Sequence, residues 1–261
     1  MIDLIHQIFI SEEAVEIEDL PASVLNNAKS FKRQHPHAQY RFWNLSDIRL
    51  FIKDNYEEGI LSAFDTLSAF ALKADLARYC ILYKLGGLYS DLSNYVTHPL
   101  AIGENIELAC FRDRQPMHGS PWMLQNSIIY ARKGCPELGM MIDFVVDHVQ
   151  SRFYGNSSLE PTGPALFGRC VTLSGRWDSY SIGVAVNIEA SSVANRSHYV
   201  QPDGTLFAIR LQGGGGRPDQ LGLKGTNVYG ELWDRRGIYN ENKLYFPHDF
   251  EGIKAKVAKV P

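Results

Sequence analysis

Apolar residues in the first half of the chain alternate between two spacings. Leu4 to Ile10 is an apolar run, interrupted only by a His-Gln pair, and has the length of a buried strand. Residues 21–31 place apolar side chains at helical spacing after a proline, and Gln39 to Trp43 is again a short strand. This alternation continues to about residue 150. It predicts an α/β fold with a mainly parallel central sheet flanked by helices.

The pattern between residues 46 and 96 predicts two helices and then a strand. Ser46 suits the N-cap of the first helix. Leucines and tyrosines from Leu72 to Tyr83 recur at helical spacing, and this second helix should end at Gly86-Gly87, where a left-handed cap costs little. Leu88 to Val96 is expected to follow as one continuous strand.

The second half adds strands at Ile106 to Phe111 and Ser127 to Ala131 and a long amphipathic helix from Pro136. After residue 180 the pattern changes. The turn sequence Pro202-Asp203-Gly204 lies between two strand-like runs, which predicts a small C-terminal β-hairpin. No internal repeat or linker divides the chain, so residues 1–261 are expected to form a single domain.

Composition narrows the class of protein. The chain has 45% hydrophobic and 21% charged residues, and its formal net charge of -3 argues against binding to nucleic acid. No apolar run is long enough to span a bilayer, and the N-terminus lacks the features of a signal peptide. We therefore expect a cytoplasmic protein, with an association at the inner face of the membrane left open. Its four scattered cysteines are expected to be reduced thiols.

The stretch from Ala74 to Val96 carries the candidate chemistry. Asp75 and Arg78 are three residues apart, so on a helix their side chains are neighbours, and their apolar surroundings predict a position at the edge of the core. In the following strand, Asp91 and Ser93 are expected to share a face and to meet a ligand beyond the strand's carboxyl end. A sugar, a ribose or a metal–phosphate unit would suit such a site. A structural ion pair followed by an Asp/Ser turn is the alternative.

The same stretch, "FALKADLARYCILYKLGGLYSDLSNYV", resembles the core motif of the DXD-containing sugar transferase family. That family, of the glycosyltransferase family 32 type, includes fungal initiating mannosyltransferases and bacterial capsular polysaccharide enzymes, and distantly the glucosylating clostridial toxins. Further blocks, "LIHQIFI", "PHAQYRFWN", "LQNSIIYARKGCPEL" and "EPTGPALF", are similar to other family segments. The motif positions present in register are Asp75, Arg78, Tyr79, Leu82, Gly86, Gly87, Tyr89 and Asp91.

The resemblance implies a GT-A-like domain, a UDP- or GDP-sugar donor and hexosyl transfer with retention. By position in the motif, Asp75, Arg78 and Asp91 would be catalytic. Asp75 and Arg78 would bind the sugar hydroxyls and the diphosphate. Asp91 would contact the ribose and the sugar and bind the metal. Trp43 and Tyr89 could equally be core aromatics and His6 a hydrogen-bonded core residue. The residues expected to bind substrate are His6, Gln7, Ile8, Trp43, Tyr89, Asn126, Thr162, Gly163, Lys224, Asn227 and Trp233.

One position departs from the family pattern. Ser93 stands where the second Asp of the motif would ligate Mn²⁺ or Mg²⁺ together with Asp91, and a hydroxyl is a poorer ligand for a hard cation than a carboxylate. The sequence allows weaker metal use, metal-independent catalysis or an inactive enzyme. Without metal, Arg78 and the cations Arg217 and Lys224 beside the glycine run Gly213 to Gly216 are candidates to neutralise the diphosphate.

Three functions are therefore compared. The first is a glycosyltransferase that acts on a saccharide or lipid-linked acceptor in surface polysaccharide biosynthesis, with loops 112–122 and 155–164 shaping the acceptor site. The second is a catalytically inactive nucleotide-sugar-binding module, motivated by Ser93. The third is an unrelated nucleotide-dependent enzyme, for which the P-loop, dinucleotide-binding and nucleophile-elbow motifs are absent.

Overall fold

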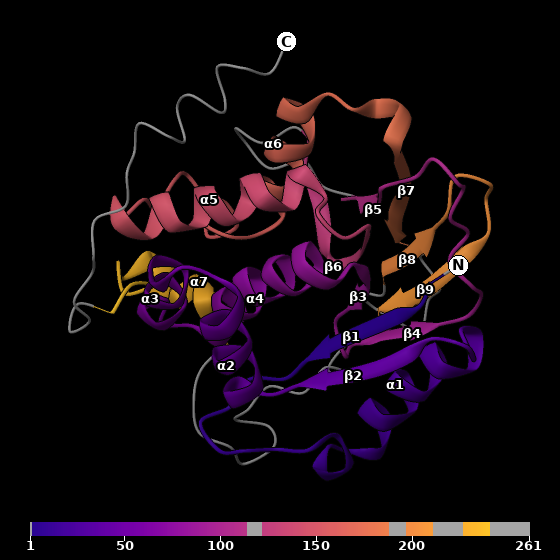
Figure 1. Ribbon diagram of the computed structural model, residues 1–261, viewed down its shortest axis with the longest axis horizontal. Helices are drawn as coiled ribbons and strands as arrows, with labels where there is room; N and C mark the ends of the chain where they lie inside the picture. The colour runs from indigo at the N-terminus through magenta and orange to yellow at the C-terminus, as the bar shows by residue number, and fades with distance from the viewer. Residues whose placement is uncertain (1, 114–121, 188–196, 211–226, 241–261) are drawn as a thin grey trace.

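The computed structural model describes residues 2–113, 122–187, 197–210 and 227–240 (Figure 1). Its strands and helices follow the predicted order as far as α5, except that one helix, at Glu58–Thr66, was not predicted. In chain order they are β1 (Leu4–Ile8), α1 (Ala22–Gln34), β2 (Gln39–Trp43), α2 (Leu45–Asn55), α3 (Glu58–Thr66), α4 (Phe70–Leu85), β3 (Gly87–Ser90), β4 (Asn94–Val96), β5 (Leu108–Arg112), β6 (Leu124–Ala131), α5 (Pro136–Gln150), α6 (Pro164–Ser174), β7 (Tyr180–Asn187), β8 (Ser197–Val200), β9 (Leu206–Arg210) and α7 (Tyr229–Asp234).

The strands form one sheet in the order β2-β1-β3-β6-β5-β7-β8-β9-β4. The α/β class and the β8–β9 hairpin are thus confirmed, but the sheet is mixed rather than mainly parallel. Among the strands of the described residues, β1 pairs in parallel with β2 and β3, and β5 with β7, and helices lie between the paired strands in the chain. Strands joined directly, such as β7–β8 and β8–β9, pair antiparallel because a short connection reverses the chain.

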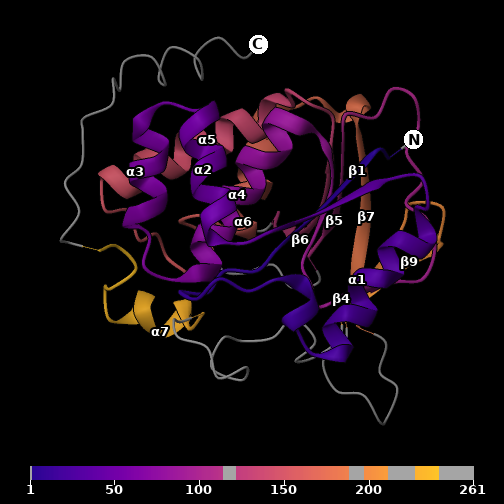
Figure 2. The same cartoon turned by 60° about the horizontal axis from the view of Figure 1, so that its bottom comes forward.

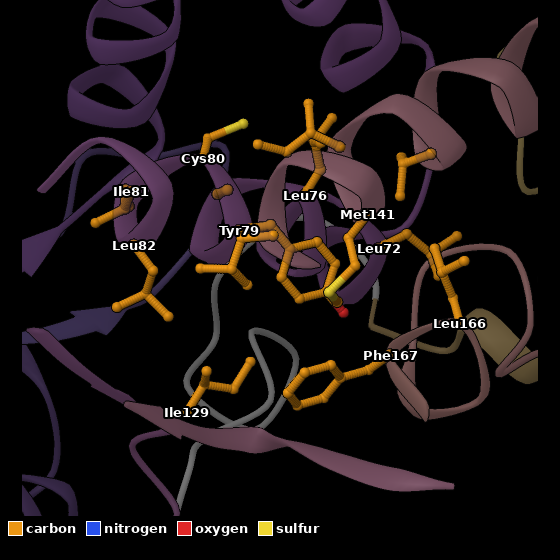
Figure 3. Close-up of a cluster of buried hydrophobic side chains, with 14 of the residues drawn as sticks. Leu72, Leu76, Tyr79, Cys80, Ile81, Leu82, Ile129, Met141, Leu166 and Phe167 are labelled. Carbon is orange, nitrogen blue, oxygen red and sulfur yellow. The ribbon is translucent and has the colours of Figure 1, made fainter. Parts of the chain in front are cut away.

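Helices cover both faces of the sheet, unequally. Helices α2 to α6 gather on one face, and α1 packs beside β4 on the other (Figures 1 and 2). The larger hydrophobic core lies under α4 and α5, where Tyr79 sits among Met141, Phe167 and Ile129 (Figure 3). A second core lies around Ile5, Phe31 and Phe207 on the α1 side. Because α4 lies in the middle of this arrangement, it is buried on most of its surface, polar residues included.

The four cysteines, Cys80, Cys110, Cys135 and Cys170, are free and buried in these cores, as expected for reduced thiols. Within the described parts of the chain, no helix is both long enough and apolar enough to cross a membrane.

Two local predictions need correction. The helix expected from Ser46 is capped by Asn44, whose side chain accepts the Asp47 amide in a capping box. The expected strand from Leu88 to Val96 is broken, because β3 ends at Ser90 and the Asn94 amide donates to the Asp91 carbonyl at 3.1 Å to close a turn. Asp, Ser and Asn favour turns through their local hydrogen bonds.

The predicted end of α4 is confirmed. Gly86 caps the helix with φ of 71°, and Gly87 follows with φ of 102°. A Cβ at Gly87 would lie 2.7 Å from the Leu4 carbonyl oxygen, so β1 and β3 approach each other more closely there than any side chain permits. This close approach holds the segment leading to Asp91 against β1.

Candidate active site

A cavity of about 260 Å³ opens where α4, β6 and the start of α6 meet the ends of β3 and β9. These positions explain its polarity, since strand ends and helix starts bring unpaired polar groups to one place. Seven of its lining residues have a charged or amide side chain: Asp75, Arg78, Asp91, Asp113, Gln125, Asn126 and Arg210.

Arg78 is the centre of this wall. It projects from the middle of α4 and is only 5% exposed. Its guanidinium lies 3.1 Å from Asp75 Oδ1 and 3.2 Å from Asp91 Oδ1, and it donates to the Asn126 carbonyl at 2.6 Å. It also covers the ring of Tyr89, 4.5 Å from the centroid. Burial alone would lower the pKa of Arg78, but Tyr89, Asp91 and Asp75 raise it, so Arg78 is a fixed positive charge.

Asp75 is buried with hydrogen-bond donors on both oxygens. Asn126 Nδ2 donates to Oδ1 at 2.9 Å, and Thr162 Oγ1 donates to Oδ2 at 2.7 Å. Burial raises the pKa of Asp75 to about 6, while Arg78 and these donors oppose the rise. The carboxylate is therefore ionised at pH 7 and becomes protonated just below it.

Tyr79 ties these partners to the core. Its hydroxyl donates to the Thr162 carbonyl at 2.7 Å and accepts from Asn126 Nδ2 at 3.0 Å. Asn126 and Thr162 thus orient Asp75 from β6 and from the loop before α6.

Asp91 is the most accessible of the three predicted catalytic residues, with a side chain 27% exposed. Besides Arg78, it accepts the Tyr89 hydroxyl at 2.8 Å, and its amide donates to the Ser127 carbonyl at 2.8 Å. The carboxylate is thus fixed by β3 and β6 while part of it faces the cavity. Such an arrangement suits hydrogen bonding to hydroxyl groups of a ligand.

The predicted site residues fall into four groups. Asp75, Arg78, Asp91, Asn126 and Gly163 line the cavity, and Thr162 and Tyr89 support it from behind. His6, Gln7, Ile8 and Trp43 are buried in β1 and β2 and do not line it. Trp233 anchors α7 by donating to the Tyr154 carbonyl at 2.6 Å, and Asn227 lies just before that helix. Lys224, Arg217 and the glycine run lie outside the described residues.

His6 connects three elements. Its Nδ1 accepts from Trp43 Nε1 at 3.2 Å, and its Nε2 lies 3.0 Å from the Gly86 carbonyl, to which it must donate. Burial lowers the pKa of His6 to about 4, so the ring is neutral at pH 7. These contacts give His6 a structural role. Its predicted part in nucleoside binding stays a prediction.

Gln7 also supports the site indirectly. Its amide donates to the Ser90 carbonyl at 3.3 Å and accepts the Tyr40 hydroxyl at 2.7 Å, which fixes the strand end that precedes Asp91. Of the loops expected to shape an acceptor site, the one before α6 contributes Ser158, Leu159 and Gly163 to the cavity. The 112–122 loop lies mostly outside the described residues.

Sequence reasoning missed Asp113, Gln125, Arg210 and Tyr229, all of which line the cavity. Asp113 directly follows β5, so its place at a strand's carboxyl end was a usable signal. Arg210 ends the predicted hairpin, and only the pairing of β9 with β4 reveals that this hairpin returns to the site.

The residues described do not fit a resident divalent cation, which prefers six or more oxygen ligands. Ser93 is buried in the turn and does not line the cavity, and Asp91 Oδ1 already contacts Tyr89 and Arg78. Within the described residues there is no group of three or more His, Cys, Asp or Glu side chains that could hold a metal ion. The expected Mn²⁺ or Mg²⁺ is therefore not supported by this donor set.

Part of the chain matches the model of a known protein family. Residues 21–109, which contain Asp75, Arg78 and Asp91, match the family model described as the glycosyltransferase sugar-binding region containing the DXD motif. This match confirms the resemblance to the DXD-containing sugar transferases.

Particular relatives support the same class. An uncharacterized glycosyltransferase, L373, of Acanthamoeba polyphaga mimivirus is 27% identical over 171 residues, which are 65% of this chain and 64% of that protein. Inositol phosphoceramide mannosyltransferase 3 of Schizosaccharomyces pombe is 28% identical over 52% of this chain and 34% of its own length. Inositol phosphoceramide mannosyltransferase 1 is 36% identical over 29% of this chain and 24% of its own length. The chain thus spans less than two thirds of each of these relatives.

Among solved structures, the PaToxG glycosyltransferase is similar with a TM-score of 0.48 and 14% identity. The match covers 65% of this chain and 69% of that one.

Proposed function

We propose that this protein is a glycosyltransferase of the GT-A type, formed by the whole chain as one domain, that transfers a hexosyl group from a nucleoside-diphosphate sugar. The observation that carries the proposal is the convergence of Asp75, Arg78 and Asp91 on one cavity, inside the segment that matches the sugar-binding family model. Two carboxylates held by one buried guanidinium present fixed hydrogen-bond acceptors to a ligand. The hydroxyl groups of a sugar need such acceptors.

Each residue has a distinct part in this proposal. Asp75 accepts hydrogen bonds from donor-sugar hydroxyls, and Asp91, being more exposed, accepts them from the ribose and the sugar. Arg78 keeps both carboxylates ionised and oriented. The family resemblance implies retention, and we assign it to attack by the acceptor on the same face of the sugar as the leaving diphosphate, whose oxygen takes the acceptor proton. The protein then contributes orientation and charge stabilisation.

The donor and acceptor proposed here are chosen from the chemistry of the cavity and from the names of the relatives. Two of the relatives are named as mannosyltransferases that act on inositol phosphoceramide. We infer a UDP- or GDP-hexose donor, with GDP-mannose the first to test. The acceptor is a saccharide or glycolipid, used in surface polysaccharide biosynthesis.

The test is transfer from a panel of UDP- and GDP-sugars to saccharide and glycolipid acceptors, with products identified by mass spectrometry. Asp91→Asn should lower the rate by about 10²–10³, because an amide cannot replace the carboxylate that pairs with Arg78. Asp178→Asn, a change of the same kind at an exposed residue, is the control and should leave the rate unchanged. Equal rates for Asp91→Asn and wild type would refute the proposal.

Ser93 favours a second candidate, a nucleotide-sugar-binding module without turnover. In that case calorimetry would detect binding of a nucleotide sugar, and no product would form with any donor. Ser93→Asp separates the two: activity that appears only in this variant, with Mn²⁺, would mean that the natural chain binds its ligand but does not transfer the sugar.

A further inference from the structure

Arg210 is a second cation of the cavity, and it comes from an unexpected direction. It is the last residue of β9, whose register pairs it with Asn94, directly after the Asp91–Ser93 turn. The hairpin thus brings an arginine beside the segment where the family motif has its metal-binding carboxylate and this chain has Ser93. Arg210 lines the same cavity as Asp91.

The two arginines differ in how their charge is used. Arg78 is buried and already lies within 3.2 Å of two carboxylates. Arg210 lies against the cavity wall with part of its surface open to solvent, and no carboxylate of the described residues lies within 4.0 Å of it. The charge of Arg78 is therefore compensated within the protein, whereas that of Arg210 is available to an anionic ligand.

The surroundings of Arg210 keep its side chain charged. Desolvation at the cavity wall would lower the pKa of Arg210, but Tyr199, Asp91 and Tyr229 raise it. Tyr199, fully buried in β8, hydrogen bonds to Ser127 on β6 at 2.9 Å. Because β8 pairs with β9, this hydrogen bond fixes the backbone of β9 relative to β6, where Ser127 also lines the cavity.

We propose that Arg210 binds the diphosphate of the nucleotide ligand and supplies the positive charge that a divalent cation would otherwise supply. This inference rests on the proposed function, because it presumes a nucleoside-diphosphate group in the cavity. Guanidinium suits the task because its planar donors match phosphate oxygens in pairs. The charge of Arg210 would also explain why this chain has Ser93 in place of the second Asp of the motif.

The test is calorimetric binding of UDP and GDP, and of uridine and guanosine, in EDTA and in Mn²⁺. The wild type should bind one diphosphate more tightly than its nucleoside, with less than a threefold change on adding Mn²⁺. Arg210→Gln should weaken diphosphate binding about 10- to 100-fold without changing nucleoside binding. Arg132→Gln removes the same charge from an exposed residue at the far end of β6 and should change neither. Circular dichroism and thermal melting establish that each variant is folded.

A charge-conserving variant sharpens the test. Arg210→Lys keeps the positive charge but loses the paired donors, so it should lose less diphosphate affinity than Arg210→Gln. An Arg210→Gln affinity equal to that of Arg132→Gln, or a tenfold or greater dependence of the wild type on Mn²⁺, would overturn the inference and leave the proposed function standing. If the wild type binds no nucleotide or nucleotide sugar at all, the proposed function fails as well.

Discussion

Asp75 shows how a buried carboxylate is kept ionised and poised for use. Its two oxygens accept hydrogen bonds from Asn126 and Thr162, and the Arg78 guanidinium lies 3.1 Å away. Burial nevertheless raises the pKa of Asp75 to about 6. Neutral pH is therefore only about one unit above the point at which the charge is lost. The site is expected to respond to mild acid.

Donor binding should weaken as pH falls from 7 to 5. The folded-state pKa of Asp75 lies above its ordinary value of 3.8, so the carboxyl takes up a proton as pH falls through about 6 and becomes a weaker hydrogen-bond acceptor for the ligand. Donor affinity measured by calorimetry from pH 5 to 8 tests this. Asp75→Asn should bind weakly at every pH, so a pH profile of that variant parallel to the wild type would contradict the assignment.

The residues of the site were predictable to different degrees. The Asp75–Arg78 pair follows from a three-residue spacing on a helix, which is a local rule, and the structure shows the pair at 3.1 Å. Ser93 was expected on the same face as Asp91 because strand periodicity was extended through a turn. Arg210 could not be predicted, since its place depends on which strand the hairpin pairs with, and no local pattern specifies that pairing.

At the scale of elements, the position of α6 depends on one close contact. A Cβ at Gly168 would lie 1.8 Å from the Trp122 carbonyl oxygen, so the helix packs backbone to backbone against the segment entering β6. Both partners border the cavity, α6 through Pro164 and β6 through Gln125. The geometry of the cavity therefore depends on a residue that does not line it.

Gly168→Ala should destabilise the fold by about 1–3 kcal/mol or more, because the added methyl group forces α6 away from β6. Unfolding in urea, monitored by circular dichroism, measures the loss. Gly230→Ala is the control, since a Cβ at that position in α7 meets nothing within 4 Å, and helix propensity favours alanine. Equal stabilities of the two variants would show that α6 is not held by this contact.

Element types were more predictable than their pairing. The helices from Pro21 and Pro136 and the end of α4 at Gly86 follow from capping and periodicity, which act within a few residues. The direction of each strand in the sheet depends on connections and on long-range packing. Alternation of strands and helices therefore predicted the α/β class but overstated the parallel share of the sheet.

At the scale of the whole molecule, three buried histidines couple stability to pH. Burial lowers the pKa values of His6, His35 and His148 below the ordinary 6.5. At a pH between the folded-state pKa and 6.5, each histidine binds a proton more readily in the unfolded chain than in the folded one. The contribution of these histidines to stability is therefore lost as pH falls below about 6.5. Asp75 acts in the opposite direction, because its folded-state pKa is raised.

His6 should account for much of this acid sensitivity. With its folded-state pKa at about 4, it should cost about 3 kcal/mol of stability between pH 7 and pH 4. His6→Gln should be less stable at pH 7, because it disturbs the contacts with Trp43 and Gly86, and its stability should fall less steeply toward pH 4. Urea unfolding at several pH values measures both slopes, and the terms from Asp75 cancel in the comparison. Parallel slopes would contradict the buried neutral ring.

The orientation of β9 means that the strand itself must keep its length, whereas the turn before it need not. Arg210 is at one end of this five-residue strand, and the turn at Pro202-Asp203-Gly204 is at the other, bordered by residues 97–101 rather than by the cavity. Deleting one residue within Leu206–Arg210 would reverse the inward and outward faces of the strand and withdraw the guanidinium. Extra residues inserted at the turn would leave the register intact, which makes it a natural place for homologues to differ in length and for an epitope tag.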